Sequence, residues 1–278
     1  MKVTRRSFLA TAAAALPAHG KSYSYELGVT DWNLRLTGKL EAVALAARVG
    51  FAGVQVSLGR KPENNKLPLD NDALIAQYKA EAKKQQIKLM GTCLDILHVN
   101  YLKNDKLGAK WVADSIPITK KLGIKVILLP FFGKGALDTQ AEKDYVGDVL
   151  RDIAPEAEKQ GIILGLEDTI SAEDNVRIVD RSRSKAVLTY YDIGNSTRNG
   201  FDPVKEIRWL GKKRICQIHL KDNPGYLGEG KIDMPAVLKA MRDINYDAYA
   251  VLETDSPSKN IEADMKRNLT YLLKLLHA

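Results

Sequence analysis

Cysteine and histidine are both scarce in this sequence, with two cysteines and four histidines among 278 residues. Two cysteines are too few for a framework of several disulfides, and they do not form the cluster that a structural zinc knuckle needs. Both of them, Cys93 and Cys216, fall inside apolar stretches of strand-like character. We therefore expect two buried, free thiols.

Apolar runs of membrane-spanning length are also lacking, so we expect no stable insertion into a membrane. An alanine-rich stretch near the N-terminus is too short to span a bilayer, and it follows a basic head. The segment TRRSFLA, with Arg5 and Arg6, resembles a twin-arginine export signal. We predict that residues 1–20 are such a signal and that the protein works in the periplasm; a frayed basic tail is the alternative.

Acidic residues are outnumbered by basic ones, 34 to 42, which gives a formal net charge of +8. Lysines such as Lys83, Lys84, Lys120 and Lys121 lie on helix-like stretches. Solvated helix faces explain them better than a nucleic-acid groove does, so we expect no nucleic-acid partner. The apolar content of 45% is enough for a sizeable core.

After residue 20, short apolar stretches alternate with helical ones along the whole chain. Strands are predicted at residues 25–32, 53–57, 87–93, 124–129, 162–167, 187–192, 215–219 and 249–253. Helices are predicted at residues 39–49, 72–86, 106–122, 140–159, 172–181, 203–210, 235–243 and 261–275, with a kink or break at Pro117. Eight such units predict a single-domain α/β fold, the (β/α)8 TIM barrel, over residues 21–278.

A doubly wound open sheet is the alternative fold. Such sheets normally have a glycine-rich phosphate turn after their first strand, and GVTDWNLRLTG lacks that pattern. An open sheet would also spread its strand ends along a flat edge, whereas a barrel gathers them on one face.

Four polar residues end the last four strand-like stretches: Glu167, Asp192, His219 and Glu253. Because the carboxyl ends of barrel strands meet on one face, we expect these side chains to lie together. Three carboxylates and one imidazole suit a single divalent ion, Mn²⁺, Mg²⁺, Co²⁺ or Zn²⁺, with positions left for substrate oxygens. The alternative is four unrelated residues that cap helices or pair with arginines.

A divalent ion held in this way polarises a carbonyl and an adjacent hydroxyl group. Carboxylates on either side of the substrate, Glu167 and Glu253, can then remove and return a proton at the carbon next to the carbonyl. The chemistry predicted is isomerisation or epimerisation of a sugar, or elimination next to a keto group.

The strand ends LED, YYDIGN, QIHLKD and VLET, the loop LGEGKIDMPAVLKAM and the segment VGFAGVQV resemble the xylose-isomerase-like TIM barrel superfamily. The resemblance covers the whole chain after the signal. It implies that Glu167, Asp192, His219 and Glu253 are the metal ligands and that Glu167 and Glu253 are the acid/base pair, as in ketose epimerases.

Ketose 3-epimerases within that superfamily differ from this chain at substrate contacts. Glu173 matches their glutamate, but Asn195 and Gly225 stand where they have a histidine and an arginine. This argues against simple ketose epimerisation. Further candidates for contact with substrate, each with a purely structural alternative, follow the strands or lie within them: Gln55, Asp95, His98, Trp32, Lys221 and the pair Phe131 and Phe132.

The export signal favours an unphosphorylated sugar or keto-sugar over a phosphorylated cytoplasmic metabolite. A lyase or hydratase acting on 3-keto-glycosides is an alternative, because some exported members of the superfamily resemble such enzymes. A non-catalytic periplasmic sugar-binding barrel is another. A zinc-cluster nuclease needs more histidines than His98 and His219. The sequence leaves open whether identical chains associate.

Overall fold

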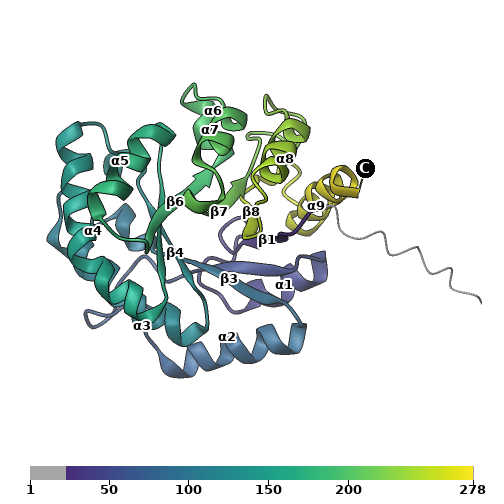
Figure 1. The fold of residues 1–278 in the computed structure, drawn as a ribbon. Coiled ribbons are helices and arrows are strands. Elements are labelled where there is room, and N and C mark those ends of the chain that lie inside the picture. Colours follow the sequence, from purple (N-terminus) through teal and green to yellow (C-terminus); the bar gives the residue numbers. More distant parts are fainter. Residues whose placement is uncertain (1–22, 278) are drawn as a thin grey trace, which may run out of the picture.

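The computed structural model describes residues 23–277, so the predicted export signal lies outside the described residues. Eight parallel strands form a closed barrel, in which β1 pairs with β8 as well as with β2 (Figure 1). The predicted TIM barrel is confirmed, and the open doubly wound sheet is wrong. The strands are β1 Glu26–Thr30, β2 Gly53–Ser57, β3 Lys88–Cys93, β4 Val126–Pro130, β5 Ile163–Glu167, β6 Val187–Asp192, β7 Ile215–Leu220 and β8 Tyr249–Leu252.

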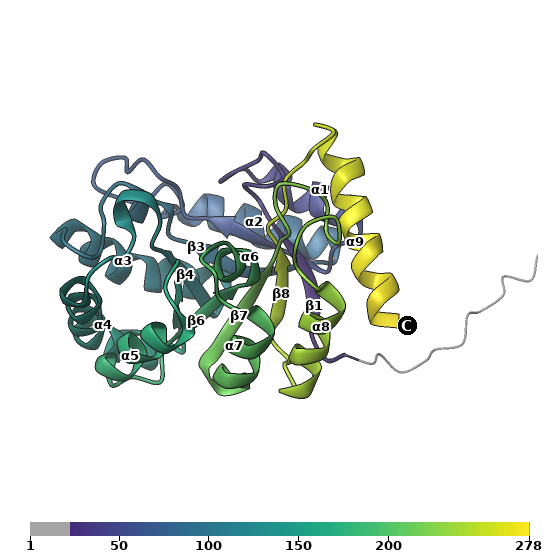
Figure 2. The same ribbon diagram turned by 90° about the horizontal axis from the view of Figure 1, so that it is seen from above.

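Helices follow the strands and form the outer layer, and Figure 2 shows α9 beside α1, where the chain closes the ring. Arg48 of α1 and Glu262 of α9 form an exposed ion pair at this closure. These helices and the strands agree with the predicted elements within two residues at every end. They are α1 Glu41–Val49, α2 Asp72–Gln85, α3 Lys106–Leu122, α4 Gln140–Gln160, α5 Ala172–Ser182, α7 Pro203–Leu210, α8 Met234–Asp243 and α9 Ile261–His277.

Local sequence explains where many of these helices begin and end. Thr139 and Glu142 form a capping box at the start of α4, each side chain accepting a backbone N–H of the other residue. Gly50, Gly123 and Gly161 end α1, α3 and α4 in the left-handed region, where a residue without Cβ is least strained.

The helix α3 is continuous through Pro117, so the predicted break does not occur. A proline leaves the carbonyl four residues earlier without its helical partner. Both Pro117 and Ala113 are exposed, so water can satisfy that carbonyl. The opposite face of the helix packs in the core through Trp111, Ile116 and Leu122, which holds the two halves of α3 together.

Four short elements were not predicted from the sequence. They are the helix α6 Ile193–Arg198 and the 3-10 helices η1 Asp95–His98, η2 Gly133–Gly135 and η3 Lys212–Arg214. The elements η1, η2 and α6 lie directly after, or close to, the C-terminal ends of β3, β4 and β6 in that order. They therefore shape the face of the barrel on which TIM barrel enzymes carry their sites.

Apolar side chains fill two separate regions. The large cluster lies between the strands and the helices, whereas a small one contains Cys93, Val126, Leu128, Tyr190 and Cys216. Alternate residues of β4 fall into the two clusters, which places the small one inside the barrel. Both cysteines are buried and free, as predicted. Within residues 23–277, no helix is both long and apolar enough to cross a bilayer.

Candidate metal centre

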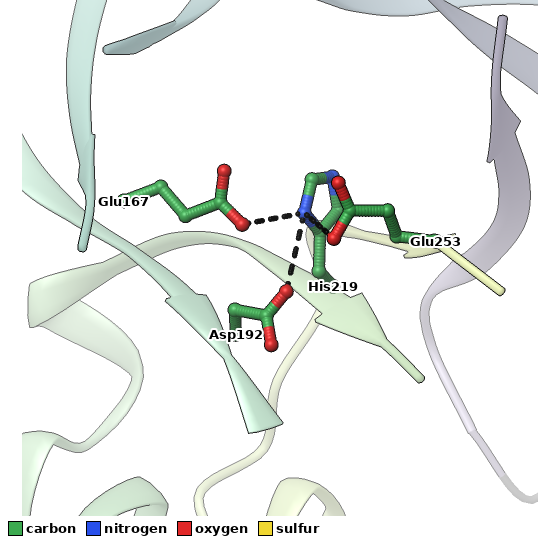
Figure 3. Close-up of side chains that lie close together, drawn as sticks. All are labelled: Glu167, Asp192, His219 and Glu253. Carbon is green, nitrogen blue, oxygen red and sulfur yellow. Dashed lines mark hydrogen bonds and ion pairs between the residues drawn. The ribbon is translucent and has the colours of Figure 1, made fainter. Parts of the chain in front are cut away.

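The four predicted ligands come together at the C-terminal ends of β5 to β8 (Figure 3). Nδ1 of His219 lies 3.0 Å from an oxygen of Glu167 and 3.6 Å from an oxygen of each of Asp192 and Glu253. Asp192 and His219 are paired in the ladder between β6 and β7, so their side chains share a face. Glu253 follows the last residue of β8, and its N–H donates to Leu220 of β7.

This arrangement fits a single divalent ion. One ligand atom from each residue lies within 4.8 Å of all the others. Metal–ligand bonds of about 2.0–2.3 Å place neighbouring donors about 3.0–3.6 Å apart and opposite donors about 4–4.6 Å apart. Glu167, Asp192 and His219 are almost fully buried, and the Glu253 side chain is 16% exposed, which leaves one side open to a substrate.

Three neighbouring side chains hold the carboxylates in place. Lys221 lies 2.8 Å from Asp192 and also forms an ion pair with Glu253. The indole N–H of Trp32 donates to the other oxygen of Glu253 at 2.9 Å. The amide of Asn195 donates to Glu167 at 3.4 Å, a weak hydrogen bond. Three of the residues predicted to contact substrate therefore adjoin the carboxylates of the cluster.

The charges in the cluster shift its pKa values strongly. Burial raises the pKa of Glu167, and the nearby Glu253 and Asp192 charges add to that effect. Burial opposes a charged His219, yet the carboxylates of Glu167 and Glu253 outweigh it and raise the pKa of the imidazole. Without an ion, a proton on His219 neutralises part of the negative charge. A divalent ion bound there would replace that proton, so its binding should release protons.

Lys221 and Asp192 form the second strongly coupled pair. Burial acts against both charged forms, but the attraction between the two groups lowers the pKa of Asp192 and raises the pKa of Lys221. The ammonium group is therefore fixed as a cation beside two of the candidate ligands. Its aliphatic chain packs on Gly194 of α6, where an added Cβ would overlap the lysine Cγ.

A layer of polar side chains lies inside the barrel beneath this centre. The oxygen of Gln55, on β2, lies 2.9 Å from Nε2 of His219 and accepts from the hydroxyl of Tyr190 at 3.0 Å. The oxygen of Gln217 also lies within hydrogen-bond distance of the Tyr190 hydroxyl, at 2.9 Å, and its NH₂ group donates to the backbone oxygen of Met90 at 2.6 Å. Gln55 is completely buried in this layer, so the predicted contact between Gln55 and a substrate is not supported by its position.

The strands β1 to β4, which carry none of the four clustered residues, also have polar groups at or near their C-terminal ends. Ser57 of β2 donates to Asp95 of η1 in a short hydrogen bond. His98 stacks on Phe132, with ring centroids 6.1 Å apart. Burial lowers the pKa of His98, while the charges of Asp95 and Glu253 oppose this shift. His98 and Asp95 are both partly exposed and lie within the electrostatic reach of the centre, consistent with a pocket wall.

Two of the sequence candidates lie elsewhere. Glu173 is exposed in the first turn of α5, where it lines a groove of about 390 Å³ with Phe201 and Trp209, and it is not brought to the cluster. Phe131 is buried in the core, so it cannot stack on a sugar ring. Sequence reasoning missed Tyr190 and Gln217. Both stand two residues before a ligand on the same strand, and the two-residue period of strands was the available signal.

The loop after β7 is organised by a single carboxylate. The carboxylate of Asp222 accepts three backbone N–H groups, from Gly228, Gly230 and Ile232, at 2.9–3.2 Å. This folds residues 223–232 around one side chain. Between this loop and α6 lies a cavity of about 560 Å³ that is also lined by Arg198.

Comparison with known proteins places this geometry in a family. Residues 43–275 match the family described as xylose isomerase-like TIM barrel. The chain belongs to this family. A curated relative from Actinoplanes sp., 2-epi-5-epi-valiolone 7-phosphate 2-epimerase, is 28% identical over 237 residues, which cover 82% of this chain and 87% of the relative.

Solved structures share the fold at low identity. A D-psicose 3-epimerase superposes with a TM-score of 0.76 at 16% identity, covering 91% of this chain and 100% of that one. A 3-keto-D-glucoside 4-epimerase from E. coli superposes with a TM-score of 0.71 at 17% identity, covering 90% of this chain and 99% of that one. Both comparisons agree with the (β/α)8 barrel described above.

Proposed function

We propose that the protein is a divalent-metal-dependent sugar isomerase or epimerase that transfers a proton at the carbon next to a carbonyl. The observation that carries this proposal is the buried cluster of Glu167, Asp192, His219 and Glu253 at the C-terminal face of the barrel. The epimerase names of the curated relative and of the solved structures support the same reaction class.

The four clustered residues would hold the ion, which can be Mn²⁺, Mg²⁺, Co²⁺ or Zn²⁺ on the chemistry of the donors. When bound, the ion would polarise the substrate carbonyl and stabilise the charge that develops on its oxygen. Glu167 and Glu253 lie on opposite sides of His219 (Figure 3). One carboxylate can therefore take a proton from one face of the carbon while the other returns a proton to the opposite face.

Other residues keep the two carboxylates in position. Trp32 and Lys221 each bind one oxygen of Glu253, which fixes the plane of its carboxylate. Asn195 contacts Glu167 from α6. Of the predicted substrate contacts, we propose Trp32 and Lys221, which bind Glu253, and the partly exposed His98 as the residues that contact the sugar.

We further propose that the substrate is an unphosphorylated sugar or keto-sugar. The 3-keto-D-glucoside epimerase among the structural relatives supports a keto-sugar, whereas the curated relative acts on a 7-phosphate by its name. Sugar phosphates are therefore the alternative class of substrate, and a substrate screen should include them. Elimination from a 3-keto-glycoside begins with the same proton removal, so a lyase or hydratase is the second candidate.

Deuterium exchange tests the function directly. The full chain, loaded in turn with each of the four ions, is incubated in D₂O with ketoses, 3-keto-glucosides and sugar phosphates. We expect deuterium at the carbon next to the carbonyl, and a drop in rate of at least 100-fold in Glu253→Gln, consistent with the loss of a general base. Glu156→Gln, an exposed change on α4, is the matched control. Undiminished exchange in Glu253→Gln would exclude the acid/base role, and binding without exchange would favour a binding-only barrel.

Export through the twin-arginine route remains our proposal for residues 1–20, supported by the segment TRRSFLA. Replacement of both Arg5 and Arg6 by lysine should keep the protein in the cytoplasm. Cell fractionation of both forms checks this, and equal periplasmic amounts would contradict it.

A further inference from the structure

The side chain of Gln55 extends from β2 across the inside of the barrel to a metal ligand on β7. It is fully buried, and its oxygen lies 2.9 Å from Nε2 of His219. The opposite ring nitrogen, Nδ1, faces the three carboxylates of the candidate centre. The contact with Gln55 therefore lies on the far side of the imidazole from the metal position.

We propose that Gln55 is a positioning residue that fixes the tautomer of His219, so that Nδ1 is the nitrogen that binds the metal. An amide oxygen can only accept a hydrogen bond, so the facing Nε2 must carry a hydrogen. A neutral imidazole has one N–H, and Nδ1 is then left with a lone pair directed at the carboxylates. The inference rests on the metal site of the proposed function, and it assigns Gln55 a role that acts through His219.

The surroundings of Nδ1 decide which way the Gln55 amide must point. Nδ1 faces three carboxylates and is the nitrogen placed to bind an ion, so Nε2 must carry the hydrogen and the Gln55 oxygen must accept it. The NH₂ group of Gln55 then points away from His219 and has no hydrogen-bond partner among the described residues. Tyr190 has one hydroxyl hydrogen and lies near the oxygens of two glutamines, so it donates to one of them at a time. A reversed Gln55 amide would face His219 as a donor and require the opposite tautomer, with the hydrogen on Nδ1.

Irregularities in the barrel make room for this contact. The register between β2 and β3 shifts at Gln55, which pairs with Gly91 and leaves Met90 outside the ladder. Such irregularities often redirect side chains near functional sites. A Cβ at position 91 would lie 3.1 Å from the oxygen of Gln217 and 3.5 Å from Cγ of Gln55. Glycine at this position therefore lets two large amides meet inside the barrel.

Gln217 supplies a matched control, because it belongs to the same buried layer and contacts Tyr190 without contacting His219. Affinity for Zn²⁺ and Mn²⁺ is measured by titration calorimetry in the full chain and in Gln55→Leu, Gln55→Glu and Gln217→Leu. We expect Gln55→Leu to bind the ions about 10- to 100-fold more weakly, the usual effect of losing a partner of a metal-bound histidine. Gln55→Glu keeps an acceptor and Gln217→Leu keeps the contact, so both should stay within about threefold of the wild type.

Nitrogen-15 spectra of the histidines in the Zn²⁺-loaded wild-type chain give a second readout that needs no variant to fold. We expect His219 with a hydrogen on Nε2 and with Nδ1 bound to zinc. Zinc on Nε2, a hydrogen on Nδ1, or equal losses of affinity in Gln55→Leu and Gln217→Leu would overturn the proposal while leaving the metal site intact. A wild-type chain that binds no divalent ion would overturn the metal site as well.

Discussion

At the level of single residues, the cation of Lys221 is the least expected feature of the candidate centre. It is 6% exposed and interacts with two of the four ligands, Asp192 and Glu253. It therefore competes with a metal ion for the same negative charge, and it also keeps the carboxylates together when no ion is present.

The change Lys221→Met tests this double role. Loss of one partner of a buried ion pair typically costs about 3–5 kcal/mol, so the metal-free variant should unfold at a clearly lower temperature than the wild type. An added divalent ion should restore much of this loss, and the rise in Tm on adding Mn²⁺ should exceed that of the wild type. Lys239→Met, which removes an exposed ion pair with Asp243, should change neither value. Equal rises in Tm on adding Mn²⁺ in the wild type and in Lys221→Met would contradict a competition between Lys221 and the ion.

Asp31 provides a second prediction, this time on pH. It is fully buried, and burial raises its pKa to about 7 although the N–H groups of Ser57 and Gly38 donate to it and oppose the shift. Since the folded-state pKa lies above the unfolded one, this residue stabilises the fold at low pH and loses that effect as pH rises from about 4 to 7.

The variant Asp31→Asn removes the titration while keeping the shape of the side chain. At pH 8 it should be more stable than the wild type by about 1–4 kcal/mol, and near pH 4 the two should be equal. Urea unfolding across this range checks the expectation, with the exposed Asp152→Asn as the control. A difference in stability that does not vary with pH would contradict it.

The cluster of four candidate ligands could be predicted because each lies at or next to the end of a largely apolar strand. The roles of other residues depended on which face of a strand or helix they occupy. Gln55 looked like a pocket residue, but β2 points it under His219, and Glu173 faces outward from α5 toward Trp209. Such orientations depend on register shifts and helix starts, which single residues in the sequence do not reveal.

At the level of elements, the loop of residues 223–232 depends on one carboxylate. Asp222 binds three of its N–H groups, and Tyr226 ties the loop to Asp264 of α9. The loop is thus a preorganised wall of the cavity beside α6, and it starts two residues after Lys221.

In Asp222→Ala, three backbone N–H groups lose their acceptor. The loop should then become the first site of cleavage in limited proteolysis, at a rate at least tenfold above wild type, because local opening exposes it. Affinity for the metal should hardly change, because His219 stays on β7 and the Asp222 side chain contacts none of the four candidate ligands. The exposed Asp247→Ala serves as the control, and an unchanged cleavage pattern would show that other contacts hold the loop.

Long elements were predictable and short ones were not, for a physical reason. A strand or a helix of several turns repeats its apolar period often enough to be recognised, whereas α6 is one and a half turns long and depends on a cap. Asp192 supplies that cap, accepting the N–H of Asn195 at 2.7 Å, while its other oxygen faces Lys221. A residue expected only as a metal ligand thus also starts a helix.

At the level of the whole molecule, the four candidate ligands lie at the C-terminal ends of four consecutive strands, β5 to β8, and β8 closes the barrel against β1. An ion bound there links strands that are distant in sequence and binds the folded state only. Metal binding should therefore stabilise the whole fold and not just the site.

At an ion concentration 100 times the Kd, binding contributes about 2.7 kcal/mol to the free energy of unfolding. For a domain of this size that corresponds to a rise in Tm of about 5–10 °C, which scanning calorimetry with a divalent ion against EDTA can measure. Asp192→Asn should show a much smaller rise, because it loses a charged ligand from the middle of the cluster. A rise in Tm of equal size in that variant would mean that the ion binds elsewhere. No rise in the Tm of the wild type would mean that the folded chain binds no divalent ion.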